Sequence, residues 1–242
     1  MAGISASCYR DWAHSRGKAF GRRSVLAGGW ALAVGCALPC AAQPVAAIVW
    51  PSGGSGRRFA VLNKGTKIGT HTILYSSATG EVQVSTDISL LAKVGFLTVF
   101  RFTHRSTEIW RAGRLVSLSS ETVEHGETLR VDGAATAQGF RVVSKSGPFI
   151  ASAATLTSNS LWTPVVLEQT SLVDAQHGGI IGVTARKFAD EQLVVAGRSI
   201  RATRHSFISP YFAGSIWYDS ENLWVHGEFE RDGSKIQYEL DS

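Results

Sequence analysis

The chain has 242 residues, 44% of them hydrophobic, and carries 24 Lys and Arg residues against 19 Asp and Glu, a formal net charge of +5. Five of the basic residues and one of the acidic residues lie in the first 42 positions, so the remainder holds 19 basic and 18 acidic side chains. That near-neutral remainder lacks the basic field that nucleic-acid binding needs, and we exclude nucleic acid as a partner.

Residues 1–42 have the organisation of a cleavable signal peptide. A basic region is followed by an apolar run from Val25 to Leu38, and Cys40-Ala41-Ala42 supplies small residues before a cleavage point after Ala42. The run is too short for a membrane span, although a membrane anchor is the alternative interpretation, and no later stretch of about 18 apolar residues occurs. We predict a periplasmic or secreted protein with no stable membrane span after cleavage.

The export route has two interpretations. The stretch Gly21-Arg22-Arg23-Ser24-Val25-Leu26-Ala27 is similar to a twin-arginine signal, and an ordinary secretory leader fits equally well. The three cysteines are all in this leader. The rest of the chain therefore has no disulfide, no thiol nucleophile and no cysteine metal site.

Residues 43–56 read as a flexible linker, because Ser-Gly-Gly-Ser-Gly does not hold a fixed backbone. We expect Trp50, just before this run, to be loose. Residues 57–242 are predicted to form a single β domain.

Nearly every window after Arg57 has the character of a strand. Val82, Val84, Thr86 and Ile88 alternate with polar residues, the period of a half-buried antiparallel strand. The predicted strands are 59–64, 67–76, 81–90, 99–111, 114–124, 128–132, 140–144, 180–188, 192–195, 201–209, 215–219, 223–230 and 235–240.

This pattern predicts an all-β fold: one large curved antiparallel sheet, a sandwich or a partly open barrel. Helix is limited to at most one short turn near 158–163, because Pro164 disfavours a helical conformation at Thr163. The closing strands are rich in aromatic residues, which either fill a core or line the wall of a cavity.

The stretch from Val99 to Val131 contains the most unusual pattern. Alternation places His104 and Glu108 on one face of a strand with aromatic residues, Trp110 among them, and places three arginines on the other face. Four residues of strand separate His104 from Glu108 by about 13 Å, too far for a direct hydrogen bond. Each must find a partner elsewhere, and the candidates on the next strand are Arg114, Glu121 and Glu124.

Other catalytic and metal motifs do not occur. The histidines after residue 57 show no metal-ligand spacing, and there is no Gly-x-Ser-x-Gly elbow. The sequence predicts no metal, no cofactor and no enzymatic activity. The run from His177 to Gly182 superficially resembles a phosphate loop, but we interpret it as a turn that enters a strand.

From about Phe59 to Leu240 the chain resembles an exported bacterial family known as the domain of unknown function DUF6134. The resemblance rests on segments 67–71, 102–110, 113–115, 160–162, 174–178 and 223–224. Phe102, Thr163 and Asp174 depart from the residues common in the family. The family has no assigned activity, so the resemblance implies a fold and export but no reaction.

We predict a periplasmic domain that binds a lipid-like or other apolar small ligand. The alternatives are a structural module that binds an envelope protein, and a hydrolase or isomerase that uses His104 and Glu108. The candidate ligand-binding residues are His104, Glu108, Trp110, Trp162, Trp217 and Tyr218.

Overall fold

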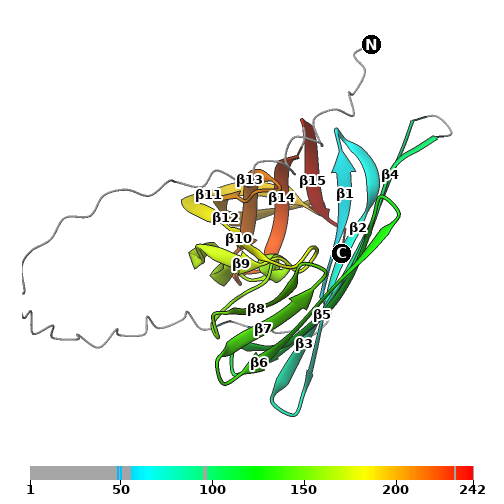
Figure 1. The fold of residues 1–242 in the computed structure, drawn as a ribbon. Coiled ribbons are helices and arrows are strands. Elements are labelled where there is room, and N and C mark those ends of the chain that lie inside the picture. Colours follow the sequence, from blue (N-terminus) through cyan, green and yellow to red (C-terminus); the bar gives the residue numbers. More distant parts are fainter. Residues whose placement is uncertain (1–47, 49, 51–55, 95–96, 232, 242) are drawn as a thin grey trace, which may run out of the picture. The chain divides into compact units, whose positions relative to one another are not determined.

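The computed structural model describes residues 48, 50, 56–94, 97–231 and 233–241. The predicted leader lies outside these residues, and so does most of the predicted linker. In the described part, the domain is a single antiparallel sheet of thirteen strands that does not close on itself (Figure 1). This confirms the all-β prediction and selects its single-sheet form. No helix there is long and apolar enough to cross a membrane.

The sheet consists of two meanders, each a run of consecutive hairpins. The first contains β1 (Arg57–Asn63), β2 (Thr66–Ala78), β3 (Glu81–Val94), β4 (Leu97–Arg111), β5 (Arg114–Glu124), β6 (Glu127–Thr136), β7 (Gly139–Ser144) and β8 (Gly147–Ala151). The second contains β11 (Thr184–Val195), β12 (Arg198–Ile208), β13 (Ala213–Asp219), β14 (Trp224–Arg231) and β15 (Ser234–Leu240). Pairing of β1 with β15 joins the two meanders, with Phe59 opposite Leu240.

Tight two-residue turns explain the hairpins. At Ala112-Gly113 both residues have positive φ, 48° and 73°, as a type I′ turn requires. The same combination occurs at Lys64-Gly65, Thr79-Gly80, His125-Gly126 and Ala196-Gly197. The Ala112-Gly113 turn was predicted, whereas the first and last of the others lie one residue earlier than their predicted positions.

The segment between β8 and β11 covers the concave face of the sheet. It contains two 3-10 turns, η2 (Ser160–Trp162) and η3 (Pro164–Glu168), and a small hairpin of β9 (Ser171–Val173) and β10 (Ile180–Gly182). Ser120 on β5 donates to the carbonyl of Ala175, while Tyr218 on β13 donates to that of Leu161. Distant strands thus contact one segment, which shows how strongly the sheet curves.

The boundaries differ from the predicted ones in three places. Strands β8 and β9 and the turn η3 were not predicted. The predicted strand 180–188 divides into β10 and the start of β11, so the turn after His177 does enter a strand. The predicted break at Asp190-Glu191 is wrong, because β11 continues through it with a shift in register after Lys187. Thr163 is extended, with φ −126° and ψ 135°, as the residue before Pro164 should be.

Candidate functional site

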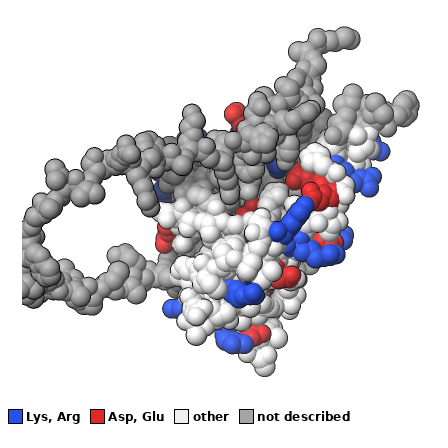
Figure 2. Space-filling view, in the orientation of Figure 1, with Lys and Arg blue, Asp and Glu red and all other residues white. Residues whose placement is uncertain are grey.

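The inner face of β4 carries the predicted alternation. Phe102, His104, Glu108 and Trp110 are buried, while Arg105 on the opposite face is exposed. On the outer face, arginines pair with acids across strands, with Arg105 Nε 2.7 Å from Asp87 Oδ2. Basic and acidic side chains accordingly lie side by side on the face in Figure 2. The inner polar groups need a different explanation, because they are buried.

Glu108 is 1% exposed and is held by two donors. Trp110 Nε1 donates to its Oε2 at 3.1 Å, and the Thr157 hydroxyl donates to Oε1. Burial raises the pKa of Glu108 to about 7, and these two hydrogen bonds offset part of that rise. The carboxyl is therefore bound to the segment that covers the sheet, and it titrates near neutral pH.

His104 is fully buried and neutral. Its Nδ1 lies 2.8 Å from Thr122 Oγ1, and Asn159 Nδ2 lies 3.0 Å from its Nε2. Because an amide nitrogen donates, Nε2 accepts and the ring proton is on Nδ1. Burial lowers the pKa of His104 to about 4. The expected partners Arg114, Glu121 and Glu124 are wrong. Thr122, which lies opposite His104 on β5, supplies one partner of the ring, and the covering segment supplies Asn159, which strand pairing could not reveal.

His104 and Glu108 belong to one polar chain although they do not touch. Asn159 contacts His104, donates to Ser106 Oγ at 2.8 Å, and donates through its backbone N–H to Thr157 Oγ1 at 3.0 Å. Thr157 in turn donates to Glu108. The chain fastens residues 157–159 to β4.

Three tryptophans pack together beside Glu108. Trp162 and Trp110 meet edge to face with centroids 5.7 Å apart, and Trp50 stacks on Trp162 at 5.1 Å with an interplanar angle of 22°. The expectation that Trp50 is loose is wrong. A planar indole buries a large apolar area, and a stacking partner is a sufficient reason for it to dock.

Replacing Trp50 with alanine should lower the free energy of unfolding by about 1–2 kcal/mol, because the half-buried ring loses its contacts with Trp110 and Trp162. Urea unfolding measures this change. The matched Trp50→Phe variant should retain most of the stability. An unchanged midpoint for Trp50→Ala would contradict the docked position.

The other two candidate ligand-binding residues, Tyr218 and Trp217, lie on opposite faces of β13. Tyr218 is on the concave face, where its hydroxyl donates to the Leu161 carbonyl at 2.7 Å. Trp217 points the other way and packs with Val195, Ala202 and Val225 in a second cluster. Neighbouring residues of a strand face opposite sides, so Trp217 does not join the other five candidates.

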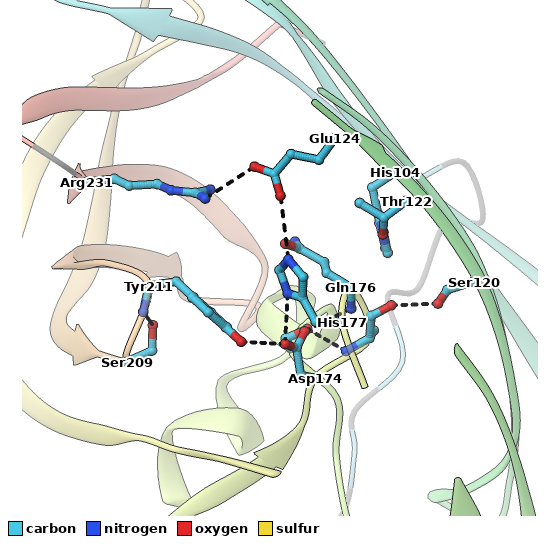
Figure 3. Close-up of polar contacts among 12 residues, drawn as sticks. His104, Ser120, Thr122, Glu124, Asp174, Gln176, His177, Ser209, Tyr211 and Arg231 are labelled. Atoms are coloured by element: carbon cyan, nitrogen blue, oxygen red, sulfur yellow. Dashed lines mark hydrogen bonds and ion pairs between the residues drawn. The ribbon is translucent and has the colours of Figure 1, made fainter. Parts of the chain in front are cut away.

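An ionic network ties the covering segment to both meanders (Figure 3). His177 Nδ1 is 3.0 Å from Asp174 Oδ2, and its Nε2 is 3.5 Å from Glu124 Oε2 on β5. Arg231 at the end of β14 lies 3.5 Å from Glu124, and the Tyr211 hydroxyl donates to Asp174 at 2.6 Å.

The network favours charged side chains. The hydrogen bond to Asp174 raises the pKa of His177 to about 9, and the bond to Glu124 adds to the rise. Burial alone would raise the pKa of Asp174, but hydrogen bonds from His177 and Tyr211 hold it below its ordinary value. A histidine protonated between two carboxylates does not act as a general base. The cluster joins the covering segment to β5 and to the end of β14.

A cleft of about 410 Å³ remains on the concave face beside η3. The η3 side supplies Thr163, Pro164, Val165 and Leu167, which are mostly apolar. The sheet side supplies more polar groups, and the lining there is Ala185, Arg186, Lys187, Thr203, His205, Tyr218, Asp219 and Asn222. Glu168 lies at the end of η3. Sequence reasoning found only Tyr218 among these residues.

A second hollow, of about 510 Å³, lies on the outer face of β2–β6. Its acids are engaged, because Asp87 binds Arg105, Glu121 binds Arg130, and Asp132 accepts from Ser119. No group of three or more His, Cys, Asp and Glu side chains that could hold a metal occurs in the described ranges. The cleft beside η3 is therefore the stronger candidate site.

The protein is a single-sheet β domain: an open sheet of thirteen strands whose concave face is covered by the segment between β8 and β11. The chain belongs to the family described as a domain of unknown function, DUF6134, whose model matches residues 59–241. Its fold is similar to a crystal structure of a beta-barrel-like protein of domain of unknown function DUF1849 from Brucella abortus, with a TM-score of 0.53 and 10% identity over 76% of this chain and 95% of that one. Comparison with curated proteins finds no match.

Proposed function

We propose that this protein is an exported binding module that holds a small, partly apolar ligand in the cleft beside η3 and catalyses no reaction. The observation that carries the proposal is the cleft itself. Its volume, about 410 Å³, is within the usual range for small-molecule sites. Its lining joins an apolar wall on η3 to a polar floor on the sheet, the combination that orients a ligand with two unlike ends.

The packing of the rest of the concave face supports this position. The covering segment packs against the centre of the concave face with side chains that are at most 2% exposed: Trp162, Val166, Leu172 and Val173. A lipid spread across that face would have to displace them. The proposed ligand is therefore confined to the cleft beside η3, within the predicted class of lipid-like or other apolar small ligands.

The burial of the two titratable candidates supports a binding role over catalysis. His104 is 0% exposed and Glu108 is 1% exposed, and each is hydrogen-bonded to the covering segment. A substrate would need that segment to leave before it could reach either group.

Native mass spectrometry of mature protein from its own periplasm should reveal extra mass that disappears on denaturation. Ala185→Phe should abolish it, because the added ring fills the cleft. Ala189→Phe on the same strand, at an exposed position outside the lining, is the matched control and should keep it. A bare wild-type mass, or extra mass that persists in Ala185→Phe, would contradict the proposal.

The second candidate function is a structural module that binds an envelope protein. It is favoured by the open sheet, because β8 and β11 each have one neighbouring strand in the described structure and so present a free edge. Ile150 on β8 is 46% exposed and Val194 on β11 is 78% exposed. A stoichiometric protein that co-purifies with a ligand-free domain would support this alternative.

A further inference from the structure

The charged groups around the cleft define the ligand further. Lys187 on β11 and His205 on β12 are cross-strand neighbours, and both line the cleft with Thr203 and Tyr218. The His205 ring meets Tyr218 edge to face at 5.8 Å. The floor of the cleft thus carries an ammonium group beside an imidazole.

The imidazole is neutral and incompletely bonded. Burial lowers the pKa of His205, and the nearby charge of Lys187 lowers it further. His205 Nδ1 is buried and finds no hydrogen-bond partner in the described structure. A hydrogen bond with the Thr203 backbone offsets part of this lowering of the His205 pKa.

The acids on β11 and β13 have hydrogen-bond partners of their own, although the nearby charge of Lys187 also helps to lower the pKa of Asp190. Asp190 accepts from Arg201 Nε at 2.9 Å and from the Thr203 hydroxyl at 2.6 Å. Asp219 accepts backbone N–H groups from two residues, each at 2.9 Å, and lies 4.0 Å from Arg57. Within the described ranges, Lys187 has no carboxylate within ion-pair distance.

Glu191 and Arg186 complete the charged surroundings. The Trp217 indole donates to Glu191, and Arg204 lies 3.9 Å from it, so this acid is also engaged. Arg186 extends over the ring of Phe188, 5.3 Å from its centroid. Glu168 remains as the one carboxylate of the cleft lining without such a partner in the described residues, and it enters from the η3 side.

We propose that the cleft binds an amphiphile with a single anionic head, a carboxylate or a phosphate ester, whose charge pairs with Lys187 on the sheet and whose apolar body lies against Pro164, Val165 and Leu167 on η3. This inference rests on the proposed function. A charge-assisted contact in a partly enclosed site is stronger than a neutral one, and it would hold the anionic head at one end of the cleft. Glu168 opposes the anion from the other wall.

Isothermal titration calorimetry of the mature protein with decanoate and with decanol tests the inference, because the two probes have the same alkyl chain length and differ in the charge of the head. Wild type should bind decanoate about tenfold more tightly than decanol. Lys187→Gln should lose this preference and leave decanol binding unchanged. Glu168→Gln should strengthen decanoate binding by a few-fold. Lys93→Gln, which removes the same charge from an exposed position on β3, is the control and should change neither affinity.

The outcomes separate the two proposals. Equal binding of both probes that Ala185→Phe abolishes would keep the cleft as the site and overturn the anionic head. A decanoate preference that survives Lys187→Gln would also overturn it. Failure of wild type to bind either probe, or binding that Ala185→Phe leaves intact, would overturn the cleft as the site and the anionic head together. Preference for a monoalkyl phosphate over decanoate, lost in Lys187→Gln, would support the inference and identify the head.

Discussion

Replacing Trp110 with alanine should lower the free energy of unfolding by about 3–5 kcal/mol. The ring is 1% exposed and packs against both Trp50 and Trp162. Its loss would also remove the indole N–H that donates to Glu108, so a buried carboxyl would lose one of its donors. Urea unfolding followed by circular dichroism measures the change.

Two variants help to interpret this result. Trp110→Phe keeps part of the packing but not the N–H, so its loss should be smaller than that of Trp110→Ala and combines the missing hydrogen bond to Glu108 with the packing of the missing ring. Ile150→Ala, at a side chain that is 46% exposed, is the control and should change stability by less than about 1 kcal/mol. A Trp110→Ala effect as small as that of the control would mean that the ring is not part of the core.

Replacing Asp174 with alanine should cost about 2–4 kcal/mol at about pH 6, and less at about pH 10. Asp174 is 2% exposed and accepts from His177, Tyr211 and the Gln176 backbone. It helps to raise the pKa of His177 from 6.5 to about 9. Because the pKa of His177 is higher in the folded protein, protonation of His177 stabilises the fold fully below pH 6.5. This stabilisation is lost as the pH rises through about 9.

The quantity to measure at each pH is the difference in the free energy of unfolding between wild type and Asp174→Ala. Glu108 also titrates near pH 7, but it does so in both proteins and largely cancels. The pKa of His104, about 4, is raised partly by Asp174, but it lies below the pH range that is compared. Asp190→Ala removes an exposed carboxylate bound to Arg201, and should cost at most about 1 kcal/mol. A difference for Asp174→Ala that stays constant from about pH 6 to about pH 10 would show that protonation of His177 contributes nothing.

Local pattern was sufficient for most of the sheet. The alternation in β4 correctly placed His104, Glu108 and Trp110 inside and Arg105 outside, because strand geometry depends only on neighbours in sequence. The turn at Ala112-Gly113 was equally local. The resemblance on which the family was suspected is confirmed over residues 59–241.

The candidate site could be predicted only in part, because its contacts are long-range. Asn159 and Thr157 reach β4 from about fifty positions away, and no periodicity in β4 could identify them. The docking of Trp50 depends on a slot formed by Trp110 and Trp162. Lys187 and His205 become neighbours only through the register of β11 with β12. The contact between Asp174 and His177 differs, because their three-residue spacing before two glycines was a local signal for it.

The pairing of β1 with β15 limits when this protein can finish folding. Phe59 and Leu240 are partners in the sheet but lie almost at opposite ends of the domain sequence. Each meander can form hairpins while the ribosome still holds the chain, but β1 lacks its second neighbour until the final strand emerges. Such a high contact order slows folding and leaves an exposed strand edge in the nascent chain, where a chaperone would bind.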